Sequence, residues 1–210
     1  MQAEERVDTT VHHHDSIYQG VLVKVDLMTP AIEAGRSKGE WQDYEMAVSV
    51  RLKDRYYPTL EGGYAFGRKG GEDNDTRFRG VFMRVGMDFN GLRKNIHSPH
   101  ALLIGLRLGT ACHQYDYTDT GETALQPPIV QETGLQSTCN RYKRWDVWGE
   151  LVGGCNVQIA SGFYMGWHLR LKVLMTRKKN GNDPRSNYIP GFGTRSEIGW
   201  GVSYYIGWRF

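Results

Sequence analysis

The residue types of a hydrolase triad occur together in one stretch of the chain, as His113, Asp116 and Ser137. Nucleophilic catalysis needs a hydroxyl, a base and an orienting carboxylate within hydrogen-bond reach of one another. These residues fall within a long connection, where the sequence pattern does not fix their relative positions. His168 with Glu150 has the composition of half a catalytic dyad, but we interpret His168 as an interior histidine within an ion network. We therefore expect no catalytic residues and no enzymatic activity.

A run of metal-ligating types, His12, His13, His14 and Asp15, stands near the start of the chain. Imidazole nitrogens bind transition metals, but the sequence offers no second cluster to complete a site. We interpret residues 1–16 as a flexible periplasmic leader and expect no metal and no cofactor.

The three cysteines are Cys112, Cys139 and Cys155. A disulfide between Cys112 and Cys139 would close a long surface loop, and such bonds persist in oxidising compartments. Cys155 should be a free, inert thiol on an apolar face. The alternative is that all three act as unrelated small apolar residues.

Two further candidates lie in the connection from Thr176 to Ser196. The basic side chains of this loop could contact lipopolysaccharide phosphates through charge-assisted hydrogen bonds, or could form a solvated hairpin tip: Arg177, Lys178, Lys179 and Arg185. The loop also carries an apolar segment, which we expect to dock on the barrel rim or on a partner protein: Tyr188, Ile189, Pro190 and Phe192.

The elements that must position these residues show period-2 alternation of apolar and polar side chains, which is typical of strands. The pattern recurs about eight times, as expected for a small barrel. It covers residues 21–27, 44–53, 59–66, 81–89, 102–109, 149–157, 163–173 and 197–210. The connections alternate between long ones (29–43, 67–77, 112–144 and 176–196) and mostly shorter ones (53–58, 90–100 and 159–162). This rhythm is typical of outer-membrane barrels.

Composition excludes two classes of protein. Hydrophobic residues make up 40% of the chain, and no stretch approaches the roughly 20 apolar residues of a membrane helix. The net charge of +3, from 26 basic and 23 acidic residues, is too even for a nucleic-acid partner.

The two faces of the strands differ in size and charge. Glycines and ions share the polar face, which suits the narrow lumen of an eight-stranded barrel. The apolar face carries aromatics near strand ends, as in the girdles of membrane barrels: Tyr44, Phe163, Trp200, Trp208 and Phe210. A soluble barrel with an apolar core is the alternative, but we favour lipid outside. The lumen should then hold a paired ion network that includes Glu45, Arg51, Arg84, Arg107, Glu150, Arg170, Glu197 and Arg209.

These segments also resemble a small outer-membrane β-barrel family of the Bacteroidota, a domain of unknown function. The resemblance spans most of the chain and is most specific at GWHLRLKVLM (166–175), YIPGF (188–192) and GVSYYI (201–206). It implies a membrane barrel and brings no catalytic residues.

We therefore predict an all-β, membrane-spanning, closed antiparallel up-and-down barrel of about eight strands over residues 17–210, with a plugged polar lumen. We expect it in the outer membrane after removal of a signal peptide, in contact with lipid and lipopolysaccharide. The expected function is that of a non-enzymatic accessory or structural subunit of a larger outer-membrane complex for protein assembly or secretion. The alternatives are a barrel enzyme acting on lipid or peptide and a free-standing adhesin or anchor.

Overall fold

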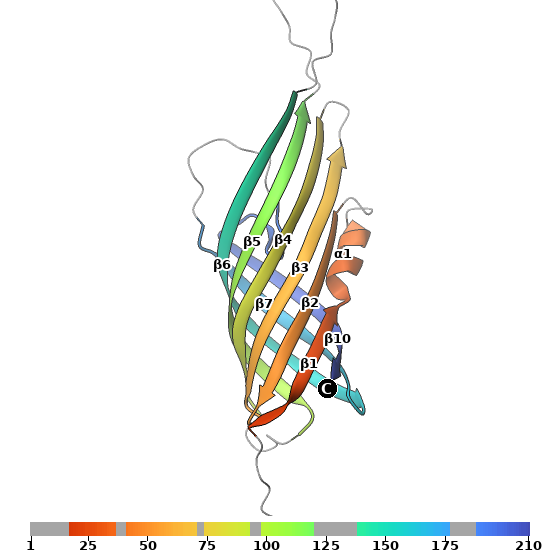
Figure 1. Cartoon of the computed structure of the whole chain (residues 1–210), viewed down its shortest axis with the longest axis vertical. Helices are drawn as coiled ribbons and strands as arrows, with labels where there is room; N and C mark the ends of the chain where they lie inside the picture. The colour runs from red at the N-terminus through yellow and green to blue at the C-terminus, as the bar shows by residue number, and fades with distance from the viewer. Residues whose placement is uncertain (1–16, 37–40, 71–73, 93–97, 120–137, 177–187) are drawn as a thin grey trace, which may run out of the picture.

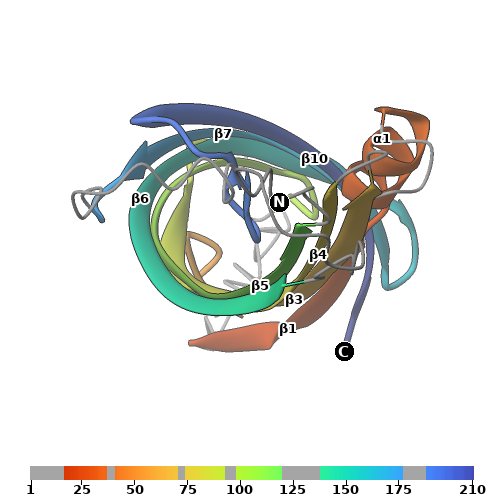
Figure 2. The ribbon, with the colours of Figure 1, turned by 90° about the horizontal axis from the view of Figure 1, so that it is seen from above.

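Eight long strands close into one antiparallel barrel (Figures 1 and 2). The computed structural model describes residues 17–36, 41–70, 74–92, 98–119, 138–176 and 188–210. The barrel strands are β1 (Tyr18–Asp26), β2 (Trp41–Leu52), β3 (Tyr56–Gly70), β4 (Asn74–Asn90), β5 (Ala101–Asp119), β6 (Thr138–Ala160), β7 (Phe163–Leu174) and β10 (Ile198–Arg209). Around the barrel their order is β1-β10-β7-β6-β5-β4-β3-β2. The predicted fold class is confirmed.

Alternation along each strand sends large apolar side chains outward and charged ones inward. On β4, Val81, Met83 and Val85 are more than half exposed, whereas Phe82 and Arg84 between them are buried. Exposed aromatics form one row near each end of the barrel. One row includes Tyr44, Tyr64, Phe66, Trp145 and Trp200, and the other includes Tyr56, Phe89 and Trp208. An apolar exterior of this kind is typical of a barrel surrounded by lipid.

The two ends of the barrel differ. At one end the connections include tight turns, such as Lys53 and Asp54, which have positive φ, between β2 and β3. Toward the other end the strands from β3 to β6 run far past the others, with lengths of 15, 17, 19 and 23 residues, although about 9–11 suffice to span a bilayer. Much of the predicted connections 67–77 and 112–144 is therefore strand, because backbone pairing continues where the apolar pattern has ended.

The predicted long connection 29–43 also requires correction, because it contains a helix. Helix α1 (Met28–Arg36) follows β1 and packs against β2 and β10. Asp26 caps it: Oδ1 accepts the backbone N–H of Met28 at 3.0 Å, and Oδ2 accepts the Thr29 hydroxyl. Of the helices in the described ranges, none combines the length and apolarity needed to cross a bilayer.

Candidate functional site

Glu61 lies at the centre of the lumen and accepts hydrogen bonds from three arginines. Its Oε2 is 2.9 Å from Nη1 of Arg84 and 3.0 Å from Nη1 of Arg170, and its Oε1 accepts from Nη1 of Arg107. Glu61 is on β3 and Arg170 on β7, so the ion pairs cross the barrel rather than follow its wall. The carboxylate therefore ties together strands that are not neighbours.

Three further carboxylates share the same guanidinium groups. Glu45 lies 2.7 Å from both Arg84 and Arg170, and Glu150 lies 3.0 Å from Nε of Arg84. Asp88 accepts from Nη2 of Arg107 at 2.8 Å. Buried charges are tolerated only when they are paired and hydrogen-bonded, and this network meets that condition. It occupies the middle of the lumen with ions and leaves no large apolar core there.

The structure brings five of the predicted network residues together: Glu45, Arg84, Arg107, Glu150 and Arg170. The sequence pattern places Glu61 and Asp88 on the same face, but only the structure identifies Glu61 as the shared acceptor. Its central position could not be read from the sequence, because it depends on how seven other strands are arranged around β3.

The other three predicted network residues lie apart, and the prediction is corrected for them. Arg51 pairs with Asp54 at the tight-turn end and donates to the Ser98 carbonyl at 3.0 Å. The Arg209 guanidinium lies over the Tyr164 ring, 5.3 Å from its centroid. Glu197 is exposed and lies just before β10, which begins at Ile198.

A hairpin closes the lumen above the ion network. The hairpin consists of strands β8 (Tyr188–Ile189) and β9 (Gly193–Thr194). It belongs to the connection between β7 and β10 and folds inward into the lumen. Its Ile189 and Phe192 pack against Phe82 and Trp148, with the Phe192 and Trp148 rings 5.8 Å apart edge to face. The hairpin thus completes a small apolar core with β4 and β6.

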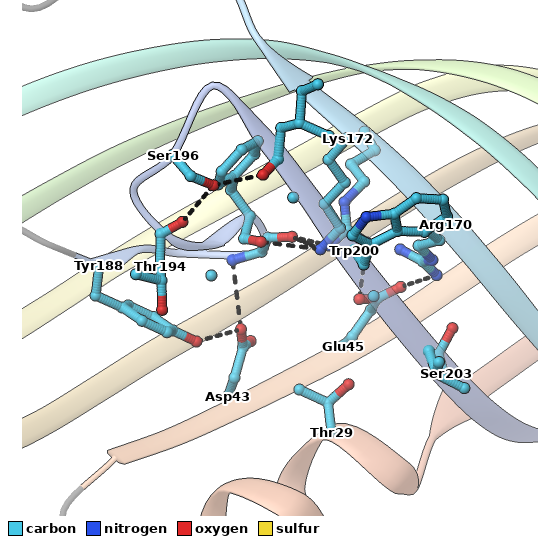
Figure 3. A pocket seen from close by; sticks show the side chains of 18 residues that line it. Thr29, Asp43, Glu45, Arg170, Lys172, Tyr188, Thr194, Ser196, Trp200 and Ser203 are labelled. Atoms are coloured by element: carbon cyan, nitrogen blue, oxygen red, sulfur yellow. Dashed lines mark hydrogen bonds and ion pairs between the residues drawn. The ribbon is translucent and has the colours of Figure 1, made fainter.

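Charged lumen side chains hold the backbone of this hairpin (Figure 3). The Gly191 carbonyl accepts from Nη2 of Arg84 at 2.6 Å and from Nζ of Lys172 at 2.7 Å. Asp43 Oδ2 accepts from the Gly191 N–H at 3.3 Å and from the Tyr188 hydroxyl at 3.2 Å. Asp43 and Lys172 were missed as site residues, although both stand on the polar face of an alternating strand.

The segment predicted to dock on the rim or on a partner instead packs inside its own barrel. Ile189, Pro190 and Phe192 are buried, and Tyr188 is half-buried with its ring edge-on to Phe78 at 5.4 Å. The three buried residues, Ile189, Pro190 and Phe192, therefore offer no free surface to a partner. The prediction of docking on the rim or on a partner is therefore corrected: the segment lies in the lumen of its own barrel.

The described residues of the catalytic combinations considered from the sequence do not come together. His113 points into the lumen and is buried beside Asp146, with 3.8 Å between Nε2 and Oδ2, whereas Asp116 lies on the outward face of the same strand. Ser137 lies outside the described residues. His168 packs on the Tyr205 ring at 4.8 Å. Glu150 pairs in register with Lys172, four residues along β7 from His168, which corresponds to roughly 13 Å along the strand.

The predicted disulfide is wrong. Cys112 is opposite Trp145 in the β5–β6 register, whereas Cys139 is opposite Thr118. Six residues of strand separate the two positions, roughly 20 Å, and a disulfide needs Cα atoms less than about 7 Å apart. Cys112 and Cys155 are both free thiols.

The remaining predicted residues lie outside the described part of the chain. They are the basic loop residues Arg177, Lys178, Lys179 and Arg185, and the run from His12 to Asp15. Among the residues that are described, no group of His, Cys, Asp and Glu side chains has the arrangement of a metal site.

The barrel wall has a gap between β10 and β2. Strand β1 lies between them only as far as Asp26, which pairs in register with Tyr205, while β10 continues for seven more residues toward Ile198. Helix α1 lies against the wall at this place instead of a strand (Figures 1 and 2). In a membrane, backbone groups without partners cost several kcal/mol each, so this edge must meet polar groups.

A cavity of about 380 Å³ lies behind the gap (Figure 3). Its floor is made by lumen side chains that include Glu45, Arg170 and Lys172, and one side is made by the hairpin. Its lining also includes Trp200 and Val202 of β10, whose side chains face outward. The cavity therefore joins the ionic lumen to the apolar exterior.

The fold is similar to that of a solved outer membrane protein. A major outer membrane protein from Thermus thermophilus superposes with a TM-score of 0.59 at 10% identity, covering 91% of this chain and 98% of that one. Ail, the attachment invasion locus protein of Yersinia pestis, matches with a TM-score of 0.43 at 10% identity, covering 91% and 97%. No curated protein matches the chain. A family model, Domain of unknown function (DUF6048), matches residues 1–210, and the chain therefore belongs to the DUF6048 family.

Proposed function

We propose that this chain is a non-enzymatic barrel of an outer membrane, and that it serves as an accessory or structural subunit of a larger complex for protein assembly or secretion. The observation that carries the proposal is the contrast between a filled lumen and a protruding sheet. The lumen is filled by the barrel's own ions and hairpin, while four strands extend well beyond the apolar band.

The exterior supports the membrane location. Large apolar side chains cover the outward face between two rows of aromatics, an arrangement typical of barrels in lipid. The fold is similar to that of a Thermus thermophilus protein described as a major outer membrane protein, which further supports an outer membrane.

The filled lumen argues against a transport role. Arg84, Glu61 and Trp148 are each at most 2% exposed although they stand in the middle of the barrel. A channel needs a polar path that water can occupy, and here side chains take that space. In a planar bilayer we expect no unitary conductance steps from the purified barrel.

The extended sheet of β3 to β6 is the surface we assign to a partner. Above the row that contains Trp145, its outward side chains include the exposed Arg77, Arg79 and Lys143. A charged, protruding surface on a rigid sheet is suited to polar contact with another protein, where complementary charge favours the correct partner.

The test is purification of the affinity-tagged chain from its native membrane in mild detergent, followed by mass spectrometry. A stoichiometric outer-membrane partner is expected, and Arg79→Glu should reduce its recovery. The matched control is Arg55→Glu, which changes an exposed arginine at the opposite end of the barrel and should leave the recovery of the partner unchanged. Recovery of the lone barrel would contradict the subunit role and favour an adhesin or anchor.

A further inference from the structure

The gap in the wall leaves one edge of β10 without a neighbouring strand. The Tyr204 N–H is the last on this edge to be bonded, to Asp26 Oδ1 at 3.2 Å, and the Tyr204 carbonyl accepts from Leu27. Because backbone groups alternate in direction along a strand, Val202 and Trp200 turn their N–H groups toward the same gap. Within the described residues, no strand pairs with them there.

The cavity behind this edge changes character along its depth. At the mouth, Ile198, Trp200 and Val202 are 59%, 69% and 45% exposed on the outer surface. At the floor, Arg170 and Lys172 are buried, and Ser196 and Ser203 also line the cavity. A ligand that fits must therefore be polar at one end and apolar at the other.

Lys172 determines the charge of the polar end. Its ammonium donates only to two carbonyls, Gly191 at 2.7 Å and Phe192 at 3.2 Å, and no carboxylate of the described residues forms an ion pair with it. The nearby Glu45 is engaged by Arg84 and Arg170. Glu150 and Glu45 act on this ammonium only through space, without direct contact. A buried charge is most stable when it is directly paired, so an anion in the cavity could bind to Lys172.

Glycine in β10 keeps the space over this ammonium open. A Cβ at Gly201 would lie 3.1 Å from both Cε and Nζ of Lys172. Any larger residue at this position would crowd the cation from the side of the gap. The wall is therefore thin where Lys172 approaches it.

We propose that the cavity is a lateral binding site for the phosphate headgroup of a membrane amphiphile. The phosphate lies at Lys172 and receives the edge N–H groups of β10, and the acyl chains leave between β10 and α1, past Trp200 and Val202, into the bilayer. A strand from another protein fits less well, because α1 packs against both β2 and β10 and occupies the place that a strand would take. The inference rests on the membrane location and not on the subunit role.

Native mass spectrometry of the detergent-purified barrel tests the proposal. Phosphatidylglycerol should be retained, whereas diacylglycerol, which has the same chains without the phosphate, should not. Inorganic phosphate should compete at least tenfold more weakly than the lipid. Equal retention of diacylglycerol would overturn the proposal, and equally strong binding of inorganic phosphate would show a free-anion site instead.

Two matched pairs of variants locate the site. Lys172→Met should lower phosphatidylglycerol retention at least tenfold, whereas Lys24→Met, which removes another buried lumen lysine that does not line this cavity, should not. Trp200→Ala at the mouth should lower retention, and Trp208→Ala near the other end of the same strand should not. Equal effects within either pair would refute the assignment.

Heat-modifiable gel mobility of each variant confirms that the barrel has formed. If Lys172→Met does not fold, the tryptophan pair still decides the question, because both side chains lie on the outer surface. If the unsubstituted protein shows no heat-dependent change in gel mobility, the membrane barrel itself is contradicted. This result is distinct from a folded barrel that retains no lipid, which contradicts only the lipid site.

Discussion

Asp26 and Tyr204 join the two ends of the barrel sheet at the place where β1 stops. Asp26 Oδ1 accepts the Tyr204 N–H at 3.2 Å and the Met28 N–H at 3.0 Å. One carboxylate oxygen thus serves both the edge of β10 and the first turn of α1. The Asp26 carboxylate thus accepts the Tyr204 N–H in place of the backbone carbonyl that a longer β1 would supply. Because this N–H is already bonded, the chain can leave the sheet after Asp26 and form helix α1.

Replacing Asp26 by Ala should weaken this seam, because both N–H groups lose their acceptor. We expect a loss of about 2–3 kcal/mol in the free energy of unfolding in lipid vesicles, with faster hydrogen exchange at the Tyr204 amide. Asp26→Asn keeps an acceptor oxygen and should lose less. Unchanged exchange at Tyr204 in Asp26→Ala would contradict the assigned bond.

Glu61→Leu should be among the most damaging lumen substitutions. Three buried guanidinium groups share this acceptor, and breaking a buried ion pair by removing one partner costs about 3–5 kcal/mol. Urea unfolding followed by tryptophan fluorescence measures the loss. Glu197→Gln, an exposed carboxylate beside β10, is the control and should change stability by less than about 0.5 kcal/mol. Similar losses in both would argue against a central role for Glu61.

The hairpin can be tested with two glycines that both have positive φ. Gly191 has φ +70°, and a Cβ there would lie 2.5 Å from the Phe82 ring, whereas Gly193 has φ +103° and open space around it. Gly193→Ala should cost about 1–2 kcal/mol from backbone strain alone. Gly191→Ala should cost clearly more, because it also displaces the hairpin from the lumen. Equal unfolding free energies would mean that Phe82 does not constrain the hairpin.

The thiol of Cys112 should react without prior reduction. Unfolding the protein in N-ethylmaleimide with no reductant should add one label each at Cys112 and Cys155, because both are free. Peptide mass spectrometry checks the positions. A digest that contained Cys112 cross-linked to Cys139 would show that the strand register between β5 and β6 is wrong.

Several features could be predicted because they depend on neighbours in sequence. The alternation at Val81 to Phe89 fixes which side chains share a face, and the structure keeps that division on every long strand. Arg84, Arg107 and Arg170 could likewise be assigned to the interior together with carboxylates. Helix α1 also has a local signal in the sequence, since Asp26 precedes it as a capping residue.

The sequence by itself determined the number of long strands and which side chains share a face of each, because a period of two residues is a property of each strand alone. Only the tertiary structure decided that Glu61 is the shared acceptor, that the 188–194 hairpin enters the lumen, and that Cys112 and Cys139 are far apart. These depend on strand register and on barrel closure, which bring together residues more than a hundred positions apart. The gap at Asp26 also depends on tertiary structure, because a short strand leaves an opening only when its two neighbouring strands extend past it.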